Sequence, residues 1–539
     1  MKLVKFFIIF LYSLSSVLGQ DIGTTEVKVV EGFKPKIPDA FRLNENAIFI
    51  DTINKDRTQK FEVVDVNLKS DFKIKPLSVA KIKDDKISEL YATKFGVSFG
   101  LPIASEANLL YNSKRSRNLS YGVIANHFAN KYYLAKNSRD KLHVYAKKIS
   151  SSYIFLTNFD FERKTALYFD EKINRADEKF FRNRFSYTKF MFSAISKETL
   201  EKKLKHHTTF FLSDFNEFSE NQIHLSSNLS KTVNNVPYNI EITFDNYLRY
   251  NNPDNKVENT DLKIFGFSPN FSFEKFDVDF DLAFNSDLAD DLSFGFFPIF
   301  KATKELVKDV LLVYGGLSHS ETLHTLKSLS DENPYIHSFE TNQTLLEDSV
   351  FLHELEITDL QELYLGMRNV LDKGHVLEAS IAYGIVTNFA NFINYNTDNY
   401  NRFRILYVDE NVKQLHLHST YSAKINEILD LNLKIDYFNW DIDVYNKPLL
   451  NANLKAPINL RDKIKIIPSL NYNGKRRIVD ELISEIPAQF HANLSFHYIY
   501  SKQLSAYVRL NNLTNTKEYL WFGYREIGFN GLFGASFSL

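Results

Sequence analysis

The 539-residue sequence contains no cysteine, so a disulfide, a thiolate metal site and a lipidated cysteine anchor are all excluded. Its charges almost cancel, with 65 basic residues against 66 acidic ones. Nucleic acid is therefore not an expected partner, because its binding depends on an excess of positive charge. Beyond residue 19 there is no run of about 18 apolar residues, and the sequence predicts no transmembrane helix.

Three signatures of common enzyme and cofactor classes are also missing. The sequence contains no His-Glu-x-x-His, no phosphate-binding P-loop and no Gly-x-Gly-x-x-Gly. No segment of about 20 to 50 residues recurs, which argues against a propeller or a solenoid. We therefore predict no enzyme activity, no cofactor and no catalytic or metal-binding residue. An enzyme stays the last hypothesis, because hydrolysis needs only a few residues brought together from distant strands.

The N-terminus has the layout of a secretory signal peptide over residues 1–19. Lys2 and Lys5 precede an apolar run at 6–14, and a short exit with small residues follows. The mature protein is therefore expected to be exported. Residues 20–87 are rich in Lys and Asp, show little alternation, and are predicted to form a periplasmic or lumen-filling segment.

Alternation of apolar and polar residues begins near residue 90 and continues to the C-terminus. It is clearest in 488–500, where the even positions are apolar and the odd ones mostly polar. Alternate residues of a strand point to opposite faces, so such a strand has one oily face and one wet face. The apolar positions of this stretch are Ala488, Phe490, Ala492, Leu494, Phe496, Tyr498 and Tyr500.

Roughly 20 to 22 such strands of about 9 to 14 residues fit the rest of the chain, a length that lets a tilted strand cross a bilayer. The series includes predicted strands at His375–Phe392 and Tyr400–Val408. Short turns such as Asp372–Gly374 and Asn426–Glu427 alternate with long links such as Thr322–Asp348. This asymmetry is typical of outer-membrane barrels, which have short turns at one end and long loops at the other.

We therefore predict an all-β fold, a transmembrane antiparallel β-barrel of about 20 to 22 strands. The predicted organisation is a signal peptide at 1–19, the N-terminal segment at 20–87 and the barrel at 88–539. A soluble multi-domain β protein is the alternative, although it should contain more turns than 18 Gly and 13 Pro provide.

The C-terminal 30 or so residues resemble the end of TonB-dependent outer-membrane receptors. In that family an Asn-Leu-x-Asn turn and a Tyr-x-x-x-Gly lead into the last strand. The matching residues here are Val508, Asn512, Leu513, Thr514, Asn515, Tyr519, Gly523, Tyr524 and Gly528. The sequence departs from the pattern in three features. The family usually has Pro before the last Gly, Arg after it, and an aromatic final residue. This sequence has Glu526, Ile527, Phe529 and Leu539 there.

The resemblance is strongest to the shorter, plug-poor receptor-like barrels of Bacteroidota. It implies a place in the cell outer membrane, contact with its lipid, and TonB or other outer-membrane or periplasmic proteins as partners. The string Glu26, Val27, Lys28, Val29 and Val30 resembles the TonB box, the strand that pairs with a sheet edge of TonB. A stray edge strand is the alternative. Segment 20–87 is too short for the plug domain of family members, so a complete plug is expected to be absent.

Two groups of polar residues are candidates for the lumen. Asp277, Asp279 and Asp281 are predicted to share the wet face of one strand, where they would attract cations or a basic ligand, or form a solvated wall paired with Lys and Arg. His416 and His418 also face one side, but two imidazoles without a third ligand make a poor metal site.

The preferred function is a receptor-like barrel that binds or passes an unknown ligand across the outer membrane. The alternative is a barrel that does not transport and serves as a structural or accessory subunit of an outer-membrane assembly. Strand pairing decides which side chains meet in the lumen, so the sequence does not identify the ligand.

Overall fold

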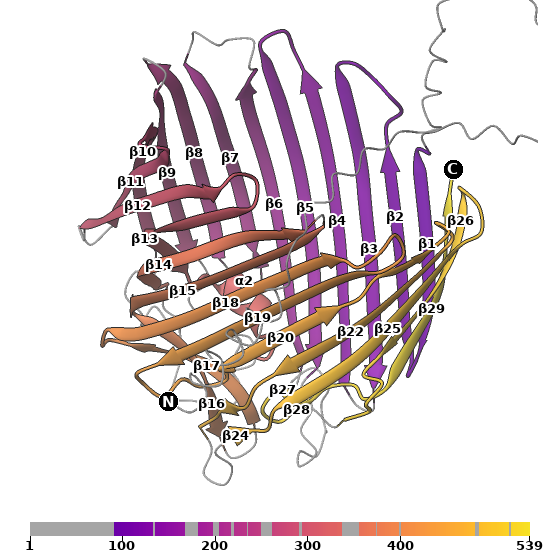
Figure 1. Cartoon of the computed structure of the whole chain (residues 1–539). Helices are drawn as coiled ribbons and strands as arrows, with labels where there is room; N and C mark the ends of the chain where they lie inside the picture. The colour runs from indigo at the N-terminus through magenta and orange to yellow at the C-terminus, as the bar shows by residue number, and fades with distance from the viewer. Residues whose placement is uncertain are drawn as a thin grey trace, which may run out of the picture. The chain divides into compact units, whose positions relative to one another are not determined.

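A computed structural model describes most of the chain after residue 90 (Figure 1). The signal peptide, segment 20–87 and the Glu26–Val30 string lie outside the described residues and stay predictions. Among the described helical residues, none forms a helix that is long and apolar enough to cross a membrane. The described residues are 91–132, 135–167, 182–197, 204–216, 220–233, 236–249, 261–289, 294–336, 355–372, 374–397, 400–479, 485–516 and 519–539.

The unit from Lys86 to Leu539 is a closed antiparallel β-barrel in which each strand pairs with the next along the chain. The first and last strands pair to close it, with Phe95 opposite Phe537. The strands are β1 (Thr93–Leu101), β2 (Ala104–Asn112), β3 (Leu119–Tyr132), β4 (Ala135–Ile149), β5 (Tyr153–Leu167), β6 (Arg182–Ser196), β7 (Lys205–Phe215), β8 (Glu220–Val233), β9 (Val236–Arg249), β10 (Leu262–Lys275), β11 (Val278–Ala289), β12 (Phe294–Val307), β13 (Leu311–Leu323), β14 (Ile357–Asp372), β15 (His375–Thr387), β18 (Val412–Lys424), β19 (Asp430–Trp440), β20 (Leu450–Lys455), β21 (Ile458–Leu460), β22 (Ile464–Asn473), β25 (Gln489–Ile499), β26 (Leu504–Asn511) and β29 (Asn530–Ser538).

The sheet contains 23 strand segments, but β20 and β21 pair with the same neighbour, β22. They are one barrel strand interrupted at Ala456 and Pro457, where the proline has no N–H to give to the ladder. The barrel therefore has 22 strands, which confirms the predicted fold class and strand number.

The two ends of the barrel differ in their links. At one end, here called the turn end, strands are joined by short links such as 276–277 and 461–463. At the other, the loop end, the links include 324–356, 388–411 and 512–529. The predicted alternation of short turns and long loops is confirmed. Both ends of the barrel sequence lie at the turn end, where the Leu539 N–H donates to the Thr93 carbonyl over 2.7 Å.

The outer face of the wall is apolar and the inner face is mostly polar. Along the closing strands, Phe95 and Phe99 of β1 and Phe533 and Phe537 of β29 are 40–69% exposed. Between them Ser98 points inward and is 1% exposed. On β25, Phe490, Phe496 and Tyr498 face outward, as the alternation at 488–500 predicts. A wall of this kind turns its oily side chains to lipid and keeps the lumen wet.

The prediction of a barrel strand at Tyr400–Val408 was wrong. The stretch His375–Phe392 ends as a barrel strand at Thr387, and Asn388, with a φ of 55°, turns the chain away from the wall. Residues Phe389–Thr397 (β16) then pair with Tyr400–Val408 (β17) in a separate two-stranded sheet. Alternation alone cannot separate a barrel strand from a hairpin in a loop, because both have two different faces.

The other elements also lie in links at the loop end. They are the helix α2 (Leu326–Glu332) and two small sheets, one made of β23 (Arg476–Arg477) and β24 (Glu485–Ile486), the other of β27 (Tyr519–Trp521) and β28 (Tyr524–Arg525). Figure 1 shows α2 inside the ring of strands and the small sheets at the same end. These elements position the candidate site.

Candidate functional site: the cap and the lumenal strip

Links from distant parts of the wall meet at the loop end in a buried apolar cluster, here called the cap core. Trp521 meets the rings of Phe392 and Phe403 edge-on, with 5.1 Å between centroids in both pairs. Tyr335 stacks on Tyr524 at 3.8 Å. The buried members of the cap core are Leu167, Phe185 and Phe215 of the wall, and Leu326, Leu329, Ile336, Phe392, Phe403, Trp521 and Tyr524 of the links.

The cap core extends across the mouth of the barrel. Its link residues come from between β13 and β14, between β15 and β18, and between β26 and β29, whereas its wall residues come from β5, β6 and β7. In a closed meander these strands lie far apart around the circumference. Their links meet only because they fold inward, and together they form a cap over the lumen.

Helix α2 is held to the wall by hydrogen bonds. Thr325 caps its first turn by accepting from the Ser328 N–H at 3.0 Å, which is a common role for threonine. From β5, the Lys164 Nζ donates to the Ser330 carbonyl at 2.9 Å and to Asp331 at 2.7 Å. Burial raises the pKa of Asp331, but hydrogen bonds from Lys164 and Lys327 outweigh it and leave the pKa below its ordinary value.

The segment after α2 is fixed by a fully buried amide. The Asn183 Nδ2 on β6 donates to the carbonyls of Pro334 and Ile336, at 2.9 and 2.8 Å. At the start of the helix, the Leu326 N–H donates to a Glu220 carboxylate oxygen of β8 at 3.2 Å. Backbone groups that would otherwise be buried without partners are therefore satisfied by the wall.

Other links are tied to each other rather than to the wall. Arg476, which is 4% exposed, donates to the carbonyls of Tyr519 and Leu520. The Asn446 Nδ2, in the link between β19 and β20, donates to the Phe392 carbonyl at 2.7 Å. The cap is thus one connected structure and not a set of independent loops.

Two basic groups are buried in the cap. His324 follows β13, and its Nε2 lies 2.7 Å from the Thr358 hydroxyl. Burial, and then the positive charge of Lys447, lower the pKa of His324 to about 4. Burial also lowers the pKa of Lys447, although Glu332 opposes this shift. The Lys447 ammonium lies 4.6 Å from the centroid of the Phe389 ring, a favourable place for a cation with little water.

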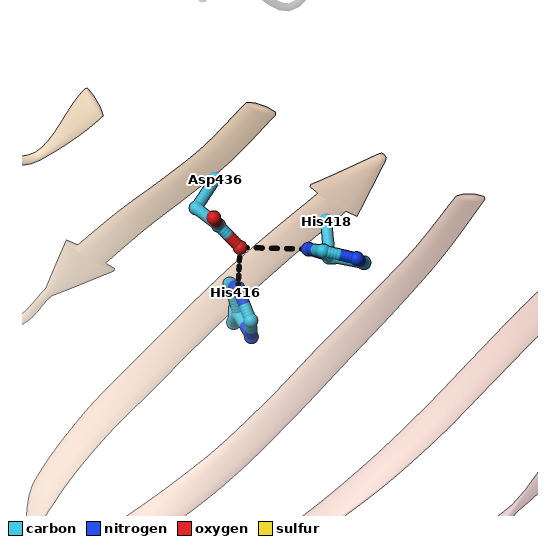
Figure 2. Close-up of side chains that lie close together, drawn as sticks. All are labelled: His416, His418 and Asp436. Atoms are coloured by element: carbon cyan, nitrogen blue, oxygen red, sulfur yellow. Dashed lines mark hydrogen bonds and ion pairs between the residues drawn. The ribbon is translucent and has the colours of Figure 1, made fainter. Parts of the chain in front are cut away.

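Below the cap, His416 and His418 of β18 meet Asp436 of β19 on the inner face (Figure 2). The Asp436 Oδ1 lies 3.2 Å from the His416 Nε2 and 2.7 Å from the His418 Nδ1. The pairing of the two strands sets His418 directly opposite Asp436, so their side chains share one face. These side chains are 17–28% exposed.

An aromatic run extends this group toward the cap. The His416 ring stacks on Phe438 at 4.2 Å, and Phe438 stacks on Trp440 at 5.4 Å. Trp440 also meets the Phe389 ring of the cap hairpin edge-on at 6.0 Å. We call His416, His418, Asp436, Phe438 and Trp440 the lumenal strip. It offers stacking surfaces and hydrogen-bonding groups side by side.

The lumenal strip corrects the reasoning from sequence about the two histidines. They do share one face, but the premise that a third ligand is missing was wrong, because Asp436 supplies it. That residue lies 18 positions after His418, and only the register of β18 on β19 brings it near. The three groups satisfy each other, and the Lys434 Nζ lies 3.2 Å from the second Asp436 oxygen.

The three predicted lumenal aspartates do not share one strand. Asp279 and Asp281 lie on β11, but Phe276 and Asp277 form the turn before it, with φ values of 57° and 56°. The prediction was wrong for Asp277, because the alternation continues into the turn and hides where the strand begins. The Ser272 hydroxyl on β10 donates to Asp281. Neither Asp279 nor Asp281 lies in the cap core or in the lumenal strip.

One short motif of the sequence is explained by its place in the fold. Gly96-Val97-Ser98-Phe99-Gly100 has the spacing of the serine-hydrolase nucleophile motif, which requires a sharp turn from a strand into a helix. Here all five residues lie inside β1. The Ser98 hydroxyl donates to Glu106 of β2 at 3.1 Å. Ser98 is therefore a structural residue of the barrel wall.

A small cavity of about 270 Å³ lies on the inner wall, away from the lumenal strip. Its charged side chains are paired, Arg509 with Glu106 and Arg139 with Glu162. The remaining lining residues are Asn108, Asn126, His127, Phe128 and Lys141. This cavity is a second group of polar side chains on the lumen wall, besides the lumenal strip.

No protein-family model and no curated protein matches the sequence. Solved structures match its fold. A variant of the ferric enterobactin receptor of Pseudomonas aeruginosa has a TM-score of 0.61 and 11% identity, over 84% of this chain and 81% of that one. The ferric-catecholate import receptor Fiu of E. coli K12 has a TM-score of 0.60 and 10% identity, over 84% and 82%.

The siderophore receptor PirA of Acinetobacter baumannii gives a TM-score of 0.60 at 9% identity, over 84% of this chain and 81% of that one. Similarity at this level of identity concerns the fold. The chain therefore shares its overall fold with these siderophore receptors, and in this chain that fold is a closed antiparallel barrel of 22 strands.

Proposed function

We propose that this protein is an outer-membrane barrel that binds a ligand in its lumen and passes it across the membrane. The observation that carries the proposal is the closed 22-strand wall with an oily outside and a polar inside. A bilayer accepts only chains that satisfy their own backbone groups, and a closed barrel does so without an edge. In this placement the turn end faces the periplasm and the loop end faces outside.

The lumenal strip is the proposed ligand contact. Its aromatic rings and its imidazole and carboxylate groups suit a ligand with a planar part and hydrogen-bonding groups. Ferric enterobactin is a first probe, because a receptor of similar fold is named for it. Asp436→Asn and Trp440→Ala should weaken binding, whereas Asp279→Asn, elsewhere on the inner wall, should not. Equal effects at all three positions would contradict this site.

Transport driven by TonB is a further part of the proposal. It depends on residues 26–30, which lie outside the described residues. If Glu26–Val30 is a TonB box, deleting residues 24–32 should abolish the capture of the barrel by immobilised TonB. A deletion of equal length at residues 60–68 is the matched control and should leave capture intact. Capture that survives the first deletion would rule out this role of the string.

A non-transporting accessory barrel is the second candidate, and the cap favours it. The cap core closes the mouth with buried aromatic contacts, as suits a permanently sealed barrel. Planar-bilayer recordings separate the two functions when the hairpin 389–408 is replaced by a short link. A transporter is expected to conduct after this change while the intact protein stays closed. A structural subunit should instead co-purify with partners in fixed ratio from mild detergent and conduct in neither form.

A further inference from the structure

Strands β12 and β13 pair over only part of their length. Their pairing reaches only to Phe300 and Leu317, so within the described strands residues 294–299 have no partner on β13. In contrast, β11 pairs with β12 as far as Phe294, and β13 pairs with β14 as far as Leu323. This stretch toward the loop end, where β12 and β13 are not paired, is here called the seam. A group of polar side chains fills this seam.

His319 is the centre of that group. Its side chain is fully buried, and its ring stacks face-on against Phe297 of β12 at 3.7 Å. The His319 Nε2 has no hydrogen-bond partner among the described residues. It lies 3.5 Å from an oxygen of Asp359 and 3.7 Å from an oxygen of Glu321. A buried ring nitrogen without a hydrogen-bond partner is rare and costs free energy. The unpaired His319 Nε2 therefore needs an explanation.

Negative charge gathers at the same place. The pairing of β13 with β14 sets Glu321 opposite Asp359, and Glu321 also hydrogen-bonds the Asp287 carboxyl of β11. The second oxygen of Asp287 is buried and lacks a hydrogen-bond partner among the described residues. Three carboxylates so close together repel each other unless a proton or a cation lies between them.

We propose that a divalent metal ion of the zinc type binds at the seam, held by His319, Glu321 and Asp359, with Asp287 beside them. The donor separations fit this ion. Ligands about 2.0–2.1 Å from a tetrahedral zinc lie roughly 3.4 Å from each other, close to the 3.5 and 3.7 Å found here and beyond good hydrogen-bond range. The imidazole favours zinc and similar metals over calcium and magnesium, which prefer oxygen ligands.

The lumenal strip provides an internal comparison with the same residue types. There the separations of 2.7 and 3.2 Å are those of hydrogen bonds, and a lysine balances the aspartate. Its facing ring nitrogens and carboxylate oxygens already have hydrogen-bond partners, whereas in the seam the His319 Nε2 and the second Asp287 oxygen have none among the described residues. The seam also has an entry path, since the Glu321 and Asp359 side chains are 29% and 27% exposed.

The ring nitrogen opposite the metal also has a neighbour. The Asn285 side-chain amide lies 3.4 Å from the His319 Nδ1. With the metal on Nε2, the Nδ1–H donates to the amide oxygen, which a half-turn of the amide brings into place without moving its heavy atoms. The bound ion joins β13 and β14 to the β11 side of the seam and so fastens strands that carry the α2 link of the cap.

The experiment is a zinc titration of the full-length protein in detergent, stripped with a chelator and followed by calorimetry. The intact protein should bind one zinc ion, and His319→Ala and Asp359→Asn should weaken its binding at least about 10-fold. His416→Ala, in the lumenal strip, is the matched control and should bind as the intact protein does.

Heat-modifiable migration in gels verifies that each variant still forms a barrel. If His319→Ala fails to assemble, Glu321→Gln, which keeps the shape and volume of the side chain, replaces it in the titration. The proposal is overturned if the intact protein binds no zinc. It is also overturned if His416→Ala abolishes binding while His319→Ala keeps it, or if calcium binds as tightly as zinc. None of these results depends on transport, so they leave the proposed function to its own tests.

Discussion

His324 lies where β13 leaves the wall, and its surroundings disfavour a positive charge. Its ring is 5.7 Å from that of Tyr407, its Nε2 meets the Thr358 hydroxyl, and Lys447 adds a like charge. A histidine that stays neutral while buried couples the cap to pH, because it must gain a proton when the cap opens in acid.

Acidification is therefore expected to loosen the cap. The pKa of His324 is about 4 in the fold and roughly 6.5 in an open chain. Above pH ~6.5 both states are neutral and stability does not change. As the pH falls, the open state takes the proton first, so the free energy of opening drops by about 1–2 kcal/mol at pH 5 and further down to about pH 4. Hydrogen exchange of the α2 amides, corrected for intrinsic rates, measures this change.

His324→Gln should remove most of the pH dependence. His207→Gln, on the exposed part of β7, is the control and should keep it. Equal protection of α2 at pH 7 and pH 5 in the unmodified protein would show that His324 is not the sensor.

Among the elements, α2 depends most on its surroundings. Seven residues are too few for a helix to be stable alone in water, so its structure comes from Leu326 and Leu329 in the cap core and from the polar contacts to the wall. Asn183 is the wall residue that holds the segment after the helix.

Asn183→Ala should release this segment without disturbing the barrel. The change removes the donor that the Pro334 and Ile336 carbonyls share, and losing the partner of a buried carbonyl costs about 1–3 kcal/mol. We expect faster proteolysis within 326–336, followed by mass spectrometry of the fragments. Asn118→Ala, in an exposed turn, should leave the rate unchanged. Unchanged cleavage in Asn183→Ala would mean that the cap core alone holds the segment.

For the whole molecule, the decisive property is that its oily side faces outward. Phe159 of β5 is 37% exposed on the outer face, whereas its neighbour Asn158 belongs to the inner face. In a soluble sandwich the exposed aromatics would have to find another sheet, and in a barrel they meet lipid.

A pair of arginine substitutions tests this arrangement. Phe159→Arg places a charge in lipid and should destabilise the barrel by about 2–4 kcal/mol if it lies near the middle of the bilayer. Asn158→Arg, one residue away, points into the wet lumen and should be tolerated. Chemical unfolding from lipid vesicles compares the two variants. Similar losses for both would argue against a lipid-facing wall.

Much of the fold follows from residues such as Phe490 and Phe496. Their alternation with polar neighbours predicts barrel strands, because a backbone in hydrocarbon must find all its hydrogen bonds in the next strand. The same signal fails for Tyr400–Val408, which forms a hairpin, and for Asp277, which forms a turn. A period of two describes any strand, whatever sheet it joins.

The sequence by itself determined a closed wall of about 20 to 22 strands with an apolar face, short turns at one end and long loops at the other, because side-chain alternation and turn composition are local properties. Only the tertiary structure decided what meets inside it. Strand register brings Asp436 to the two histidines, inward-folded links build the cap core, and the missing pairing between β12 and β13 gathers charge around His319. These contacts join residues far apart in the chain, and their geometry exists only once the sheet has closed.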